Sequence, residues 1–271
     1  MNATAVPPAN RVRDTLLQGR PAWGTWVQTR SPEAAEAAAA TGFDFVVIDL
    51  QHGSASIAEA ATLIRSVSSW GASPIVRTPD SSPNLIGRLL DSGAHGVLVP
   101  DIKTADQARA AVLAAQYAPA GTRGACPTIA ATAHGAIPWG VYRPWADTEV
   151  MVWALIEHPE AIENIQEIAA SGLHALVLGP FDLSLAMGLD GQVDHPDVID
   201  ALDRVVLAAE AAGIETVAVL FDEVPNIEKG ARHWLDRGCR ILTASSDRWA
   251  LTQAWSGALD GLRDAGDACH K

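Results

Sequence analysis

The sequence lacks the cysteine patterns of disulfide-rich and zinc-binding proteins. Its three cysteines, Cys126, Cys239 and Cys269, lie far apart and form no CxxC pair. This spacing argues against a disulfide framework or a zinc ribbon and fits a reducing compartment. The first ten residues also lack the basic and apolar regions of a signal peptide, and no apolar run reaches the ~18 residues of a membrane span. We therefore expect a cytoplasmic protein with no membrane partner.

Basic residues are scarce. The chain has 19 Lys and Arg against 32 Asp and Glu, which gives a net charge of −13. Such a polyanion repels nucleic acid and anionic lipid at long range, so we expect neither as a partner. The lysines are Lys103, Lys229 and Lys271. Lys103 directly precedes a capping box at Thr104, so we expect it to point outward at a helix entrance rather than to form a Schiff base.

Several catalytic signatures are also missing. No GxGxxG follows the first predicted strand, which weakens the case for a dinucleotide-binding fold, and no GxSxG, HExxH or Walker A motif is present. The segments "FDEVP" and "ASSD", which follow the last two predicted strands, are acidic and free of glycine. They argue against the usual barrel phosphate site, so we expect an unphosphorylated substrate.

Eight short apolar runs alternate with helical patterns along the chain. The runs occupy residues 22–28, 43–50, 73–78, 96–102, 151–157, 175–180, 215–221 and 240–245. Continuous apolar runs are typical of parallel strands covered on both faces. The intervening helical segments are 31–42, 82–93, 104–117, 158–172, 195–213 and 222–238. Eight strand–helix units predict an α/β protein in which residues 1–271 form one (β/α)₈ TIM barrel, with residues 1–10 as a flexible tail.

The helical segments carry matching start and stop signals. The segment 31–42 begins with Ser31 and Pro32 and ends at Gly42, and the segment 82–93 begins in the same way with Ser82 and Pro83. These residues are typical of a helix cap, a first helical position and a helix end. The longest connection, 119–150, contains several Gly and Pro residues and Arg123. A long loop after a barrel strand is more often functional than a spacer, although Arg123 could simply anchor it.

Polar residues stand where the predicted strands end. They are Asp49, Gln51 and His52 in "VVIDLQHG", Arg77 in "IVRTP", Glu157 in "ALIEHPE" and Asp182 in "GPFDLS". Taken singly, each could be a helix cap, a structural histidine or a surface salt bridge. The carboxyl ends of barrel strands form the active-site face, so their convergence on one rim favours a functional site.

Glu157 and Asp182 follow neighbouring strands and would repel each other unless a cation neutralised them. Hard carboxylate oxygens suit Mg²⁺ or Mn²⁺, and the metal could act as a Lewis acid on a bound α-keto acid. A glycosidase-type acid/base couple, or two separate structural roles, are the alternatives. If the chain turns at Gly179 into a helix, the N–H groups of Phe181 and Asp182 could hold a substrate carboxylate.

The motifs "GFDFVVIDLQHG", "PIVRTP", "YAPAGTRG", "ALIEHPEAIENI" and "GPFDLSLAMG" occur in this order and together resemble the HpcH/HpaI aldolase family. That family comprises class II, metal-dependent pyruvate aldolases of 4-hydroxy-2-oxo acids, related to 2-dehydro-3-deoxyglucarate aldolase. The resemblance implies reversible cleavage to pyruvate and an aldehyde through a metal-stabilised pyruvate enolate. It implies Mg²⁺ or Mn²⁺, with Co²⁺ or Zn²⁺ as alternatives, and a homo-oligomer, a hexamer of dimers that exchange a C-terminal helix.

The resemblance also implies roles for single residues. Glu157 and Asp182 match metal ligands, and Arg77 matches the arginine that contacts the pyruvate carbonyl. His52 matches the histidine of base catalysis, and Asp91 its dyad partner. The remaining matches are Asp49, two positions before the usual Glu-His pair, Arg123 in "PAGTRG", and Gly179, Phe181 and Gln51 as further substrate contacts.

Two positions depart from the pattern that many family members share. Gln51 replaces a glutamate and removes a charge beside His52, while Leu155 replaces a glutamine, so the water contacts and the aldehyde scope of the family do not carry over to this chain. The aldehyde stays open among succinic semialdehyde, tartronate semialdehyde, glyceraldehyde and aromatic aldehydes. The alternative functions are a CoA-thioester lyase like the citrate-lyase β-subunit and a non-catalytic barrel that binds pyruvate or another oxo acid.

Overall fold

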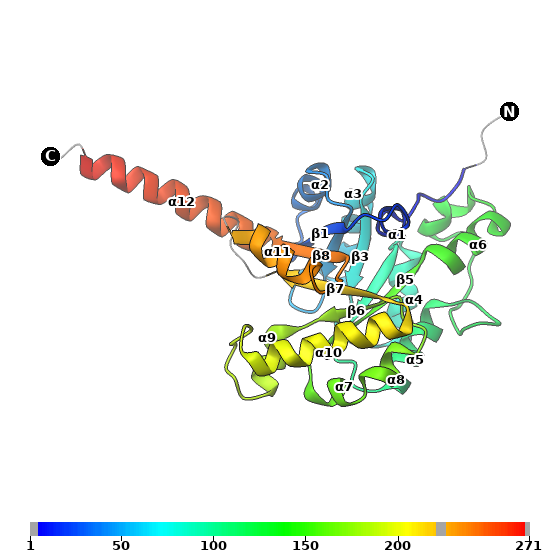
Figure 1. The fold of residues 1–271 in the computed structure, drawn as a ribbon. Helices are drawn as coiled ribbons and strands as arrows, with labels where there is room; N and C mark the ends of the chain where they lie inside the picture. Colours follow the sequence, from blue (N-terminus) through cyan, green and yellow to red (C-terminus); the bar gives the residue numbers. More distant parts are fainter. Residues whose placement is uncertain (1–4, 221–225, 269–271) are drawn as a thin grey trace.

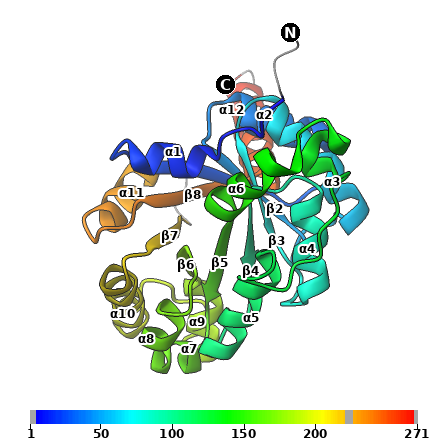
Figure 2. The same cartoon turned by 90° about the vertical axis from the view of Figure 1, so that its right-hand side faces the viewer.

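Eight parallel strands close into a barrel in the computed structural model, which describes residues 5–220 and 226–268. Each strand pairs with the next in the sequence, and β8 pairs with β1, which confirms the predicted (β/α)₈ TIM barrel (Figure 1, Figure 2). The strands are β1 (Ala22–Val27), β2 (Phe45–Asp49), β3 (Ser73–Arg77), β4 (Gly96–Val99), β5 (Met151–Ile156), β6 (Ala175–Leu178), β7 (Glu215–Leu220) and β8 (Ile241–Ser246). All eight overlap the predicted runs; residue 221, the predicted end of the seventh, lies outside the described residues.

Helices surround the strands, as the view in Figure 2 shows. They are α1 (Arg11–Leu17), α2 (Pro32–Ala40), α3 (Ile57–Ser69), α4 (Pro83–Asp91), α5 (Ala105–Ala115), α6 (Trp139–Glu149), α7 (Pro159–Glu163), α8 (Ile165–Ala169), α9 (Pro180–Ala186), α10 (Pro196–Ala212), α11 (Ile227–Leu235) and α12 (Asp247–Ala268), with a 3₁₀ helix, η1 (Ala130–Gly135). The long connection 119–150 thus contains η1 and α6. Among the helices described, none is both long and apolar enough to cross a membrane.

Local signals explain several helix boundaries. The Ser31 hydroxyl accepts a hydrogen bond from the Ala34 N–H at the start of α2, and Thr104 forms the predicted capping box at α5. Ser82 stands at the same position before α4, but its side chain makes no capping hydrogen bond, so Pro83 alone marks that start. The predicted helix 158–172 is divided into α7 and α8 at Asn164, whose side-chain amide donates to the carbonyl of Lys103 at 3.0 Å.

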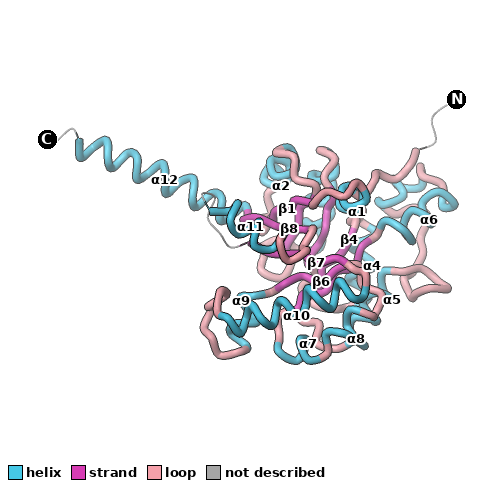
Figure 3. The backbone as a smooth tube through the Cα atoms, viewed as in Figure 1, coloured by secondary structure: helices cyan, strands magenta, loops and turns pink. Residues whose placement is uncertain are grey.

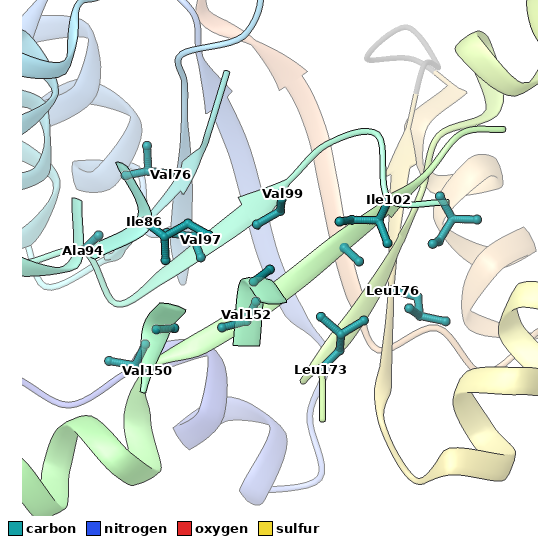
Figure 4. Packing of buried hydrophobic residues seen from close by; sticks show 14 of the residues in the cluster. Val76, Ile86, Ala94, Val97, Val99, Ile102, Val150, Val152, Leu173 and Leu176 are labelled. Atoms are coloured by element: carbon teal, nitrogen blue, oxygen red, sulfur yellow. The ribbon is translucent and has the colours of Figure 1, made fainter. Parts of the chain in front are cut away.

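Two apolar clusters explain why the strands are hydrophobic throughout. On β4, Val97 and Val99 belong to the cluster between strands and helices, shown in Figure 4, while Leu98 belongs to the cluster inside the barrel. Side chains alternate between the two faces of a strand, so a strand buried on both faces needs apolar residues at every position. Inside the barrel, the Phe45 ring packs edge-on against Trp153, with 5.5 Å between ring centroids.

The N-terminal segment packs against the end of the barrel at which the strands begin. Asn10 is fully buried, and its side-chain amide donates to the carbonyls of Glu149 at 2.7 Å and His95 at 3.3 Å. Val12 of α1 joins the cluster inside the barrel. Residue 10 therefore belongs to the folded body, although it falls within the segment 1–10 expected as a flexible tail. Residues 1–4 of that segment lie outside the described part of the chain.

His95, at the same end of the barrel, should make the fold sensitive to acid. Burial lowers the pKa of His95 to about 4, and its Nδ1 lies 2.9 Å from the Ser73 hydroxyl. An unfolded histidine titrates near 6.5, so the unfolded state takes up the proton first as the pH falls. The contribution of neutral His95 to the free energy of unfolding is therefore lost between about pH 6.5 and pH 4. About 2 kcal/mol of it is lost by pH 5.

The measurement is urea unfolding of the wild type and His95→Gln at pH 7.5 and pH 5. We expect the wild type to lose about 2 kcal/mol more than the variant over this interval. The comparison cancels contributions from other groups, including His174, whose pKa is also lowered by burial. Equal losses in the two proteins would contradict the assignment to His95.

Helix α12 extends away from the barrel as a single projecting helix (Figure 1, Figure 3). It carries several exposed large apolar side chains: Trp249, Leu251, Trp255, Leu259 and Leu262. Apolar side chains repeated along one projecting helix are characteristic of a surface that packs against another chain.

Candidate active site

A cavity of about 520 Å³ opens at the carboxyl ends of the strands. Its lining comprises Trp26, Gln28, His52, Arg77, Leu155, Glu157, Leu178, Gly179, Pro180, Phe181, Asp182, Val219, Leu220, Ser245, Ser246 and Trp249. The structure therefore brings together His52, Arg77, Glu157, Gly179, Phe181 and Asp182 from the predicted set. This location is the one at which barrel enzymes carry their active sites.

Arg77 and Asp49 form a buried ion pair at the base of this cavity. They are the last residues of β3 and β2, and they are direct partners in the strand register. The Arg77 Nε and Nη2 donate to the two Asp49 oxygens at 2.8 and 2.6 Å. Burial raises the pKa of Asp49, but the hydrogen bonds and charge of Arg77 outweigh it and hold that pKa below its usual value. Asp49 is therefore held in its ionised form and anchors Arg77.

Further donors complete the shell around Asp49, which is fully buried. The Gln28 side-chain amide donates to it at 3.0 Å, and the backbone N–H groups of Gln51 and His52 donate at 3.0 and 3.1 Å. Asp49 thus fixes the turn that carries His52 to the rim. Gln51 is not part of the cavity lining, and its buried side-chain carbonyl has no hydrogen-bond partner among the described residues.

The Arg77 guanidinium also stacks on Trp26. Its Cζ lies 4.7 Å from the centre of the Trp26 ring, whose Nε1 donates to the Thr243 hydroxyl at 2.9 Å. A cation over an indole face is favourable, and the hydrogen bond fixes the ring. The Arg77 Nη1 group donates no hydrogen bond to any described residue. The Arg77 side chain is 11% exposed and lines the cavity. Arg77 is therefore rigidly held with one donor edge free.

Glu157 and Asp182 supply the two carboxylates of the cavity. Glu157 directly follows β5 and is buried, whereas Asp182 lies in the first turn of α9 and is exposed. The pKa of Glu157 is raised to about 7, mainly by burial and also by the charge of Asp182, while the Asp101 N–H, which donates to Glu157 at 2.8 Å, acts in the opposite direction. A buried carboxylate beside a second one favours a cation that neutralises both.

This pair is the donor set that fits a divalent metal. Carboxylate oxygens are the preferred ligands of Mg²⁺ and Mn²⁺, and two of them leave coordination positions for a small oxygen ligand. Among the residues described, no group of three or more His, Cys, Asp or Glu side chains surrounds a single point. Glu157 and Asp182 are therefore the residues that could hold a metal in this cavity.

Gly179 allows close packing between the end of β5, which Glu157 follows, and the turn that leads to Asp182. A Cβ at this position would lie 2.8 Å from the Cβ of Glu157 and 3.2 Å from the Cδ1 of Leu155. Only glycine allows the end of β6 to approach the end of β5 this closely. Phe181, two residues later, is exposed and lines the cavity, which keeps open the prediction that N–H groups of this turn receive a substrate carboxylate.

Asp91 and Arg123 are paired with each other outside the cavity lining. The Arg123 Nη2 donates to Asp91 at 2.6 Å and to the Tyr142 hydroxyl at 3.3 Å, and its guanidinium lies 4.5 Å from the centre of the Tyr117 ring. Within the described part of one chain, no hydrogen bond or ion pair joins His52 to Asp91. The dyad and the substrate contact of Arg123 stay predictions that a single chain does not test.

Lys103 lies outside the cavity lining, at the entrance of α5 as predicted. Its Nζ lies 2.8 Å from Asp101, and this hydrogen bond raises the pKa of Lys103 above its usual value. A lysine that is more firmly protonated than usual is a poor amine nucleophile. The structure therefore offers Lys103 no role as a Schiff-base residue.

Sequence reasoning missed several residues of the cavity and its support. Trp26 lies on β1 and Gln28 directly follows it, and their alternate spacing was an available signal. Asp101 has an unusual positive φ of 57° and its N–H donates to Glu157, and nothing in "VPDIK" indicates either feature. Trp249, on α12, also had no local signal.

Comparisons with known proteins agree with this architecture. The sequence model of the family described as HpcH/HpaI aldolase/citrate lyase matches residues 22–247. A hydroxypyruvate/pyruvate aldolase of Delftia acidovorans is 34% identical over 249 residues, which cover 91% of this chain and 90% of that protein. A 4-hydroxy-2-oxo-heptane-1,7-dioate aldolase of Salmonella dublin is 32% identical over 246 residues, covering 90% and 91%. The crystal structure of an HpcH/HpaI aldolase/citrate lyase family protein from Burkholderia cenocepacia matches with a TM-score of 0.84 and 31% identity, covering 94% of this chain and 99% of that one.

Proposed function

This chain belongs to the HpcH/HpaI aldolase/citrate lyase family, and from that premise we propose that it is a metal-dependent aldolase. It would reversibly cleave 4-hydroxy-2-oxo acids to pyruvate and an aldehyde. The observation that carries the proposal is the presence of Glu157, Asp182 and Arg77 in one cavity at the barrel mouth. The aldolase names of the two relatives support the same chemistry.

Glu157 and Asp182 would hold the metal, Mg²⁺ or Mn²⁺, with Co²⁺ or Zn²⁺ as alternatives. When bound, it would supply a Lewis acid for the oxo acid. The raised pKa of Glu157 supports this assignment, because a buried carboxylate without a counterion is costly to ionise. Gly179 allows the turn that leads to Asp182 to pack directly against Glu157, which supports the placing of both carboxylates in this cavity.

Arg77 would orient pyruvate and stabilise the negative charge that develops on its oxygen during cleavage. Asp49 and Trp26 hold the guanidinium from two sides, so its free Nη1 edge is positioned before the substrate binds. A donor that needs no reorganisation contributes most when charge develops in the transition state.

His52 would accept the proton of the 4-hydroxyl group. Breaking the C3–C4 bond then gives the aldehyde and the pyruvate enolate, and protonation at C3 releases pyruvate. His52 lines the cavity, and its carbonyl oxygen accepts a hydrogen bond from Arg248 at 3.1 Å, which helps to fix the loop. Asp91 and Arg123 do not enter this scheme, because neither lines the cavity of the single chain.

A CoA-thioester lyase is less well supported. Such an enzyme needs cationic groups for the phosphates of CoA. The bases in the lining of the described cavity are Arg77, which is already paired, and His52.

The proposal is tested by pyruvate C3 hydrogen–deuterium exchange, followed by NMR in D₂O. The protein is treated with EDTA and then resupplied with Mn²⁺ or Mg²⁺, and no aldehyde is needed. We expect exchange that stops with EDTA and returns with metal. Exchange that survives EDTA would indicate a Schiff base instead, and no exchange under either condition would favour the thioester lyase or the non-catalytic barrel.

We also propose that α12 packs against a second subunit, in a hexamer built from dimers that exchange this helix. The exposed apolar side chains along α12 support this assembly. Trp255→Glu combined with Leu259→Glu should reduce the native mass measured by light scattering, because two charges in an apolar interface are costly to desolvate. Gln253→Glu, on the same exposed helix, is the matched control. An unchanged native mass in the double variant would contradict the proposal.

A further inference from the structure

Helix α12 starts at the rim of the cavity, beside the end of β1. Its first residue, Asp247, directly follows β8, and the strand register sets Ser246 opposite Trp26. Gln28 and Thr29 follow β1 at the point where α12 begins. Because Trp26 and Gln28 both line the cavity, the start of this helix lies next to side chains of the site.

The Asp247 carboxylate binds the backbone that follows β1. Its Oδ1 accepts a hydrogen bond from the Gln28 N–H at 2.9 Å, and its Oδ2 accepts from the Thr29 N–H at 3.1 Å and the Thr29 hydroxyl at 2.5 Å. Oδ1 also accepts from the Arg248 N–H at 2.9 Å, in the first turn of α12. Hydrogen bonds to a carboxylate are stronger than those between neutral groups, so this half-buried residue fixes the end of β1 to the start of α12.

Gln28 is held at three points and connects Asp247 to Asp49. Its N–H donates to Asp247, its carbonyl oxygen accepts from the Ser54 N–H at 2.9 Å, and its side-chain amide donates to Asp49 at 3.0 Å. Both backbone polar groups of Gln28 are therefore occupied while its side chain reaches the fully buried Asp49. Loss of the Asp247 carboxylate would free one of these points and change the position from which the amide reaches Asp49.

The turn that carries His52 rests on the same support. A Cβ at Gly53 would overlap the carbonyl oxygen of Asp49 and lie 3.1 Å from the carbonyl oxygen of Gln28, so the turn packs directly on both backbones. From the other side, the Arg248 Nη1 donates to the carbonyl oxygen of His52 at 3.1 Å. The first two residues of α12 thus contact the His52 turn directly and through Gln28.

Asp49 passes this support on to Arg77. Its Oδ2 accepts both the Gln28 amide, at 3.0 Å, and the Arg77 Nη2, at 2.6 Å. Three consecutive contacts therefore lead from Asp247 to the guanidinium. A donor contributes most to a transition state when it is held in place beforehand, and a small displacement of such a group lowers the rate strongly.

We propose that Asp247 is a positioning residue for the aldolase reaction, which holds Arg77 and the His52 turn in place through Gln28. The inference rests on the proposed function and adds to it a residue at the root of α12. Among the described residues, no hydrogen bond joins Asp247 to Glu157, which lies across the barrel at the end of β5. Metal binding should therefore not depend on Asp247.

The test is pyruvate C3 exchange at varied pyruvate concentration, with the full chain and saturating Mn²⁺. Asp247→Ala should lower kcat by about 10- to 100-fold and change the KM for pyruvate by less than about threefold, because the oriented guanidinium matters most as charge develops. The Mn²⁺ affinity should stay at the wild-type value. Rates are expressed per Mn²⁺-binding site, so a fraction of unfolded protein does not lower kcat.

Two controls separate positioning from stability. Thr29→Val removes the hydroxyl from the same carboxylate but leaves the Gln28 contact, so it should lower the melting temperature by about 2–4 °C and keep kcat within about twofold. Asp106→Ala removes an exposed aspartate from the first turn of α5 and should change neither quantity. A loss of kcat in Thr29→Val as large as that in Asp247→Ala would overturn the inference.

A double-mutant cycle tests the path through Gln28. Gln28→Met removes the amide that donates to Asp49 while leaving the backbone groups, and should itself lower kcat about tenfold with unchanged Mn²⁺ affinity. In that background Asp247→Ala should cost less than about threefold, because the path is already broken. Equal losses in both backgrounds, or an unchanged kcat in Gln28→Met, would overturn the inference.

Asp247→Asn keeps one oxygen that can accept from the Gln28 N–H. It should therefore retain a kcat within about threefold of the wild type, and a loss equal to that of Asp247→Ala would contradict the assigned contact. Metal-dependent exchange in the wild type with an unchanged kcat in Asp247→Ala would overturn this inference alone. Absence of exchange in the wild type would overturn the proposed function and this inference with it.

Discussion

Glu157→Gln should lower the rate of pyruvate C3 exchange by about 10²- to 10³-fold or more, because it removes one of only two carboxylates proposed for the metal. Glutamine keeps the shape of the side chain and can still accept the hydrogen bond from the Asp101 N–H. The loss would therefore report the missing charge rather than a collapsed cavity. The measurement is the exchange rate by NMR together with Mn²⁺ affinity by titration.

Glu160→Gln is the matched control, since Glu160 is an exposed acid three residues later in the first turn of α7. It should change neither the exchange rate nor the Mn²⁺ affinity. In EDTA, Glu157→Gln should unfold at the same temperature as the wild type or higher, because it relieves a buried carboxylate placed beside another. Full exchange activity in Glu157→Gln would refute the metal site.

The barrel was predictable because its signals are local and repeated. Most strands are apolar on both faces, as Val97, Leu98 and Val99 show, and several βα units repeat the same start and stop signals. The polar residues at the strand ends were predictable for the same reason, since the fold class places all such ends on one rim. Glu157 and Arg77 lie in the cavity because they follow β5 and end β3.

The rest of the site depends on contacts that no local pattern encodes. Asp49 was predicted as part of the catalytic set from its match to the family motif, but the sequence did not indicate that the strand register places it against Arg77 and buries it. Asp91 and Arg123 carry equally suggestive charges, yet α4 and the long loop place them beside Tyr117 and Tyr142. Direction, burial and partner are properties of the tertiary arrangement, so residue type alone could not supply them.

Arg77→Met should abolish pyruvate exchange and also destabilise the fold by about 3–5 kcal/mol, because it leaves a buried charge on Asp49 without its partner. Asp49 is fully buried, and the remaining donors are the Gln28 amide and two backbone N–H groups, none of which carries a charge. Urea unfolding at pH 7.5 measures the stability, and Arg88→Met, an exposed arginine on α4, is the control for loss of an arginine. That control should change the free energy of unfolding by no more than about 0.5 kcal/mol.

The double variant Arg77→Met/Asp49→Asn separates the two roles of Arg77. The asparagine oxygen can keep accepting from the backbone N–H groups of the turn that carries His52, and its NH₂ group can donate to the Gln28 side-chain oxygen once that amide turns over. Asparagine brings no charge that needs a partner. We expect it to recover about 2 kcal/mol or more of the stability lost in Arg77→Met, while pyruvate exchange stays absent. Recovery of stability without recovery of exchange would show that Asp49 holds Arg77 and that Arg77 acts on the substrate. If the double variant is as unstable as Arg77→Met, the loss instead comes from the stacking of Arg77 on Trp26, which both variants lack.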